Sequence, residues 1–143
     1  MFYGFEFKPF KAAINDGLHA IMSAHINFTN LTEDGLPVTS SKRALTGLLR
    51  EEMGFEGLII IDDIEMKAIH DNYATIEATL KTVNAGANLV CICHDLHYQI
   101  GASDCFNKAL ETGELAMDTL NERVARILKY KEKLNVELNT HLL

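Results

Sequence analysis

Apolar residues concentrate in three short segments of the chain, Leu18–Ala24, Leu58–Ile61 and Ala87–Cys93. Segments of this length, with apolar residues at most successive positions, are typical of strands that are covered on both faces, as in parallel sheets. The polar stretch Asn27–Thr39 contains a glycine and a proline, so it is predicted to be a loop.

Helical patterns lie between the three predicted strands. The spacing of apolar residues and the placement of Pro, Gly and capping residues predict helices over residues 9–16, 41–53, 73–84, 97–111 and from about 118 onward. We expect Ser40 or Ser41 to cap the second of these. Regular alternation of helix and strand predicts an α/β fold with a parallel sheet and crossover helices. Three strands cannot close a barrel, so the sheet is either small and open or a piece of a larger one.

The last predicted helix carries an apolar stripe along one face, which we interpret as core packing. Its members are Leu120, Val124, Ile127, Leu128 and Leu134. The chain has 143 residues, enough for one domain over residues 1–143 with a core of its own. No stretch is long and apolar enough to span a bilayer, and the N-terminus lacks the pattern of a signal peptide. We therefore expect a cytoplasmic protein with no membrane partner.

Charge and cysteine content narrow the function classes. The formal net charge is −7, and the only basic cluster is the short Lys129–Lys133. Nucleic-acid binding needs clustered Lys and Arg, so we expect no nucleic-acid partner. Cys91, Cys93 and Cys105 are odd in number, which favours buried free thiols in a reducing compartment over a disulfide framework.

Polar residues follow each predicted strand, where functional groups of parallel α/β folds gather. The segments are Ser23–His25, Asp62–Asp63 and Cys93–Asp95. Side chains alternate along a strand, so one carboxylate of the Asp62–Asp63 pair should point toward the sheet axis and the other away. A carboxylate there can act as nucleophile, base or metal ligand. Alternatively, Asp63 caps the next turn and Asp62 is merely solvated.

The two outer segments also leave alternatives open. His25 either borders a binding pocket or caps its strand. Cys93–Asp95 lacks the paired spacing of metal ligands, so we interpret it as a loop at the mouth of the sheet and expect no metal site.

One stretch, LTGLLREEMGFEGLIIIDDIEMKAI at Leu45–Ile69, resembles glycoside hydrolase family 3, above all its bacterial β-N-acetylhexosaminidases. These carry an L-R-x-E-[LM]-G-F-x-G segment before a barrel strand and [ST]-D-[DA]-L-x-M at its end. Ala20–His25 resembles the preceding strand, Asn84–Leu89 the start of the last strand, and Arg123–Leu128 the closing helix. The resemblance implies the C-terminal half of a (β/α)₈ TIM barrel, about three parallel strands with flanking helices.

The resemblance also implies an activity. It identifies Asp62 as the nucleophile of a retaining mechanism and places His25, Asp63 and Met66 around the sugar, with Met66 alternatively plugging the barrel mouth. The implied substrate is a saccharide with terminal N-acetylglucosamine, of the cell-wall muropeptide class met in peptidoglycan recycling. Neither a metal nor an organic cofactor is implied.

Two departures from the family pattern bear on this expectation. Ile61 stands where relatives have Ser or Thr, and neither the family's His-Asp acid/base dyad nor its Lys-His-Phe-Pro-Gly-His-Gly motif occurs in the 143 residues. The adjacent pairs His70–Asp71 and His94–Asp95 lack the sequence context of that dyad. We therefore expect a truncated barrel.

Three interpretations of the chain follow from these observations. The first is a glycosidase subunit or fragment, and the second is an inactive half-barrel that serves as a binding or interaction module. The third, an unrelated small α/β domain, is disfavoured by the match over Leu45–Ile69. A half-barrel exposes strand edges and apolar faces, so we expect either self-association or a complementary N-terminal half-barrel as partner.

Overall fold

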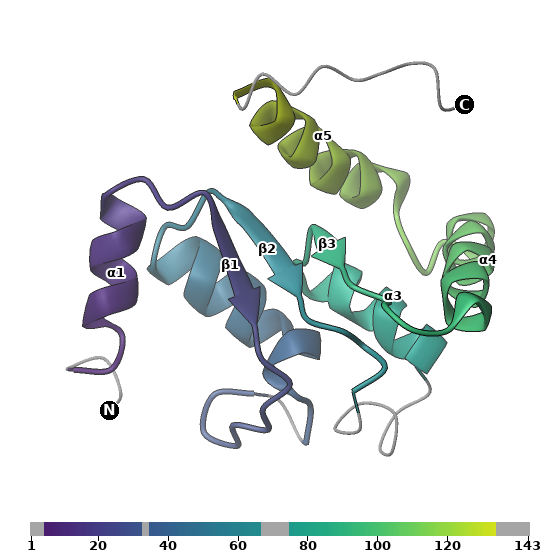
Figure 1. Cartoon of the computed structure of the whole chain (residues 1–143), viewed down its shortest axis with the longest axis horizontal. Helices are drawn as coiled ribbons and strands as arrows, with labels where there is room; N and C mark the ends of the chain where they lie inside the picture. The colour runs from purple at the N-terminus through teal and green to yellow at the C-terminus, as the bar shows by residue number, and fades with distance from the viewer. Residues whose placement is uncertain (1–4, 33–34, 67–74, 134–143) are drawn as a thin grey trace.

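The structure, a computed structural model, describes residues 5–32, 35–66 and 75–133 (Figure 1). Its elements in chain order are α1 (Lys8–Asn15), β1 (Ala20–Ser23), the short 3-10 helix η1 (Val38–Ser40), η2 (Arg43–Glu52), β2 (Leu58–Ile61), α3 (Thr75–Ala85), β3 (Leu89–Val90), α4 (Leu96–Thr112) and α5 (Met117–Lys133). Apart from η1, this is the order that the apolar pattern predicts. None of the described helices is long and apolar enough to cross a membrane.

The three strands form one parallel sheet in the order β1-β2-β3, so β2 is central. Ala20 lies opposite Leu58, and Ile60 lies opposite Leu89. Because all strands run the same way, their carboxyl ends meet at one edge of the sheet, where the arrowheads lie in Figure 1. The prediction of a parallel α/β sheet with crossover helices is confirmed.

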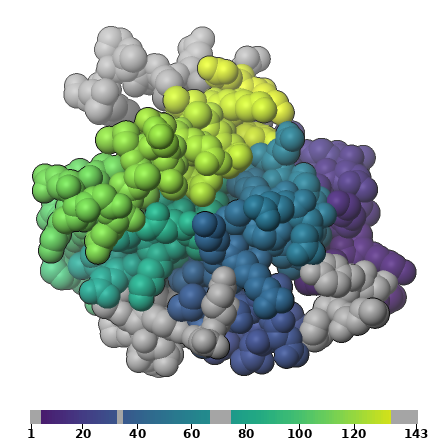
Figure 2. Space-filling view, turned by 180° about the vertical axis from the view of Figure 1, so that it is seen from behind, coloured from purple at the N-terminus to yellow at the C-terminus, as the bar shows by residue number. Residues whose placement is uncertain are grey.

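Helices cover one face of the sheet. Ile59 and Ile61 are fully buried against Leu45 of η2 and against Ala85, at the end of α3. Seen from behind in Figure 2, the side chains of the helices form a closed surface over this face. Leu58 and Ile60, which alternate with the buried isoleucines, face the opposite side and are only half-buried. In the described part of the chain, that second face is open.

Two element predictions need correction. The helix after Ser41 is wound as a π-helix, and Met53 donates its N–H to the carbonyl of Leu48, five residues back, at 2.9 Å. Ser41 still acts as the predicted cap, because its Oγ accepts the N–H of Ala44 at 3.1 Å. β3 is much shorter than the predicted 87–93, because its neighbour β2 already ends at Ile61 and the chain after it turns into a loop.

The apolar stripe of α5 is only partly core. Leu120 packs beside the buried Leu115, but Val124 is 42% and Leu128 44% exposed, so the prediction is wrong for these two. The reason is position: Figure 1 shows α5 beyond the amino ends of the strands, where little of its length meets the sheet. Leu134 and the predicted helix start at Tyr73 lie outside the described residues.

Candidate active site

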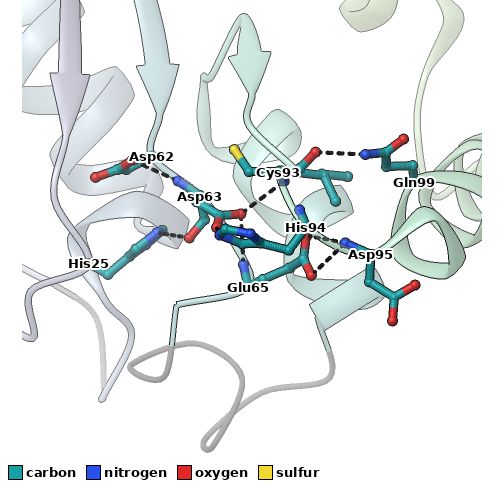
Figure 3. Close-up of polar contacts among 9 residues, drawn as sticks. His25, Asp62, Asp63, Glu65, Cys93, His94, Asp95 and Gln99 are labelled. Atoms are coloured by element: carbon teal, nitrogen blue, oxygen red, sulfur yellow. Dashed lines mark hydrogen bonds and ion pairs between the residues drawn. The ribbon is translucent and has the colours of Figure 1, made fainter.

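All three predicted strand-end segments meet at the carboxyl edge of the sheet (Figure 3). His25 follows β1, Asp62 and Asp63 follow β2, and His94 lies in the loop after β3. Parallel pairing brings these ends together, although more than thirty residues separate each from the next along the chain.

Asp62 is half-buried and lies on the open side of the sheet. It comes two residues after Ile60, and strand alternation therefore gives both residues the same face. Its Oδ1 accepts the main-chain N–H of Asp63 at 2.8 Å. Among the described residues its second oxygen has no hydrogen-bond partner. A carboxylate held by one oxygen and free at the other is oriented yet still able to form a new bond.

Asp63 is the hub of the site, and only 9% of the residue is exposed. Its Oδ1 accepts the N–H groups of Glu65 and Cys93, both at 3.2 Å. Its Oδ2 lies 3.0 Å from Nε2 of His94. The two carboxylates thus differ as strand alternation predicts: the Asp63 carboxylate is occupied by partners from the β2 and β3 loops, whereas that of Asp62 is open.

His25 links the end of β1 to this hub. Its Nε2 donates to the main-chain carbonyl of Asp63 at 3.0 Å, and Nδ1 lies 3.2 Å from Oγ1 of Thr39. A carbonyl can only accept, so Nε2 carries the proton, and in the neutral ring Nδ1 then accepts from the Thr39 hydroxyl. Both ring nitrogens are engaged within the protein. Met66, 48% exposed, lies in the turn that follows and donates its N–H to the carbonyl of Asp63.

The departure at Ile61 has a structural answer. Ile61 is fully buried in the cluster beneath the helices, on the face of β2 opposite to Asp62. A hydroxyl at that position would therefore not be directed at the Asp62 carboxylate, and replacing it by isoleucine leaves the contact of Asp62 with Asp63 intact.

Sequence reasoning missed Glu65, and it placed His94 only in a loop at the mouth of the sheet without a contact to Asp63. The Glu65 carboxylate accepts the N–H of His94 at 2.8 Å and that of Asp95 at 3.1 Å, which holds the β3 loop against the β2 loop. Asp95 in turn caps α4 by accepting the N–H of His97 at 2.8 Å. An Asp before an apolar helix start is a recognisable capping signal, but the contacts between the two loops leave no sequence pattern.

The site is acidic, and this affects the thiol beside it. Desolvation, then the charges of Asp63 and Cys91, raise the pKa of the exposed Cys93. Across the described residues, no three His, Cys, Asp or Glu side chains lie close enough together to hold a metal ion.

Enzymes built on a barrel of parallel strands carry their active sites at the carboxyl ends of the strands. Asp62 lies at that end of the sheet here. The chain matches the glycosyl hydrolase family 3 N-terminal domain over residues 2–130 and therefore belongs to that family. The three strands and their flanking helices are part of the family's TIM-barrel domain, as the resemblance implies.

Individual relatives are β-hexosaminidases. The chain is 31% identical to beta-hexosaminidase A of Pseudoalteromonas piscicida over 134 residues, covering 80% of this chain and 22% of the relative. A solved family 3 β-N-acetylglucosaminidase from Paenibacillus sp. superposes with a TM-score of 0.88 at 33% identity, over 94% of this chain and 26% of that one. For the enzyme from Thermotoga maritima the TM-score is 0.78 at 30% identity, over 85% and 27%. The chain thus spans about a quarter of the length of these relatives.

Proposed function

We propose that the chain carries the nucleophile of a retaining glycoside hydrolase of the β-N-acetylhexosaminidase type, and that the nucleophile is Asp62. The observation that carries the proposal is the position of Asp62 at the carboxyl edge, on the open face, with one oxygen fixed at 2.8 Å and the other without a hydrogen-bond partner among the residues that the structure describes. The names of the relatives support the substrate class, a saccharide with terminal N-acetylglucosamine. We place the reaction in cytoplasmic peptidoglycan recycling.

The chemistry follows from this geometry. The open oxygen of Asp62 forms a bond to C1 of the sugar while the bond from C1 to the leaving oxygen breaks, and the leaving oxygen takes a proton from solvent. Water later attacks C1 and loses a proton to solvent while the bond from C1 to the Asp62 oxygen breaks, so the configuration is retained. The N–H of Asp63 fixes the orientation of the carboxylate before the reaction. His25, Asp63 and Met66 border the sugar in this proposal, and no metal or cofactor takes part.

An activated sugar tests the nucleophile separately from proton transfer. An N-acetylglucosaminyl fluoride needs little protonation, because fluoride leaves as the anion while Asp62 takes its place on C1. We expect the chain to gain the mass of one sugar, on the peptide that contains Asp62. Asp62→Asn should remove this labelling, and Asp16→Asn, an exposed residue at the end of α1, is the matched control.

A chromogenic N-acetylglucosaminide with a poorer leaving group supplies the second part of the test. We expect little or no turnover by the isolated chain, because the family's His-Asp acid/base motif, which would assist departure of the leaving group, does not occur in the sequence. Measurable turnover that Asp62→Asn abolishes would contradict that expectation, but it would support Asp62 as the nucleophile. Labelling that persists in Asp62→Asn, or no labelling at all, contradicts the proposal. Absence of labelling would favour the alternative function, an inactive half-barrel that serves as a binding or interaction module.

A further inference from the structure

Asp63 is held from two sides, by the loop after β3 and by the end of β1, and these contacts restrain its main chain. The loop after β3 contacts its carboxylate through the N–H of Cys93 and the ring of His94. From the end of β1, His25 donates to its carbonyl at 3.0 Å. The N–H of the same residue is the donor that fixes Asp62. The orientation of the Asp62 carboxylate therefore depends on contacts that Asp62 does not make itself.

The ring of His94, in the loop after β3, contacts the Asp63 carboxylate. The His94 side chain is 75% exposed and that of Asp63 only 12%, yet Nε2 and Oδ2 lie 3.0 Å apart. The main-chain N–H of His94 donates to the carboxylate of Glu65 at 2.8 Å. His94 is therefore held through its main chain as well as through its ring. The ring nitrogen Nδ1 bonds to none of the residues that the structure describes.

The contact with His94 affects how firmly Asp63 is held. The side chain of Asp63 is only 12% exposed, so its carboxylate depends on donors from the protein. Loss of the His94 contact would leave that carboxylate with fewer donors and would weaken its attachment to the loop after β3. The main chain of Asp63, and with it the N–H that Asp62 uses, would then be less restrained.

From these contacts we propose that His94 is a positioning residue, which acts on the reaction through Asp63 by keeping the Asp62 carboxylate aligned. The inference rests on the proposed role of Asp62. It gives His94, which the sequence placed only in a loop at the mouth of the sheet, a role in the site, and it assigns the Asp63 carboxylate to alignment of its neighbour.

Two substitutions of similar size separate the hydrogen bond from the bulk of the ring. His94→Met keeps volume and loses the donor, whereas His94→Gln keeps an N–H that can reach Asp63. We expect His94→Met to lower the limiting rate of labelling by the glycosyl fluoride by about ten- to a hundredfold, with the half-saturating concentration unchanged. His94→Gln should restore most of the rate. His97→Met, an exposed histidine in the first turn of α4, should behave as wild type.

Each other outcome overturns the inference in a recognisable way. Equal limiting rates in wild type and His94→Met, together with a lower melting temperature of the variant, would show that His94 only holds the two loops together. A raised half-saturating concentration at an unchanged rate would make it a sugar contact. If wild type itself is not labelled, the proposed function fails and the inference with it. That result differs from the others because no variant then matters. Circular dichroism of each variant checks the fold.

Discussion

The two ends of the sheet both carry concentrated polar groups, but they use them differently. At the amino end, Arg50 donates to the carbonyls of Phe55 and Gly57 and to Oδ1 of Asn88, which lies 2.7 Å away. Asn88 Oδ1 also accepts the N–H of Ile59 at 3.0 Å. At the carboxyl end, by contrast, Asp62 has one donor and an open side.

The difference shows which polar groups hold the fold. Arg50 sits among like charges: burial, then Arg126 and Arg123, lower its pKa to about 10. Its Nε, like that of Arg123, is buried and has no hydrogen-bond partner within the described part of the chain. Such a cation persists because its other N–H groups satisfy the carbonyls of Phe55 and Gly57, just before β2. A polar group whose hydrogen bonds go to the protein itself, such as Arg50, stabilises the fold. A group that is only partly hydrogen-bonded, such as Asp62, can still react.

The largest effect should come from breaking the amino end. Arg50→Met removes every acceptor contact of the guanidinium and leaves buried carbonyl oxygens unpaired, so we expect a loss of about 3 kcal/mol in the free energy of unfolding. Asp62→Asn should change it by less than about 1 kcal/mol, because an amide oxygen still accepts the N–H of Asp63. Urea titration followed by circular dichroism measures both.

The exposed Lys42, at the start of η2, gives the control Lys42→Met, which should unfold like wild type. If Arg50→Met also stayed within about 0.5 kcal/mol of wild type, the distinction between a structural and a chemical end would be lost.

A smaller effect concerns what covers the open face. Met22 in β1, which lies opposite Ile60 on the open face, is 54% exposed. We propose that a second copy or a complementary half-barrel covers this side, and we expect light scattering to give a mass above the 16.0 kDa of one chain.

Substitution at the strand face tests that expectation. Met22→Lys should weaken self-association by about tenfold, the scale of one buried apolar side chain. Lys42→Met leaves the face unchanged and serves again as the control. If wild type has the mass of a monomer in light scattering, self-association is contradicted. The open face of the sheet would then be uncovered in the isolated chain.

The sequence predicts the fold better than the site, for physical reasons. Four apolar residues before Asp62 define both the central strand and, by alternation, which carboxylate is open. The length of β3 depends on where its partner strand ends, and the exposure of Val124 depends on where α5 lies, so neither can be read from its own segment. The contact of His94 with Asp63 joins two loops, and no local pattern encodes it.

The smallest effect tests the acidity of the carboxyl end through Cys93. Its raised pKa leaves little thiolate near neutral pH, so alkylation by iodoacetamide should be slow at pH 8 and accelerate as pH rises beyond 9. Asp63→Asn removes one of the negative charges that disfavour the thiolate and should speed alkylation at pH 8 by about two- to threefold.

Cys105 provides an internal reference in the same chain. Desolvation, then Glu114 and Glu77, raise its pKa, and Asp63 is not among the causes. Its alkylation rate should therefore be the same in wild type and Asp63→Asn, as mass spectrometry of the two peptides would measure. If Cys93 also kept its wild-type rate, the charge of Asp63 would not reach the thiol. The raised pKa of Cys93 would then come from desolvation and from the charges of Cys91 and Glu65.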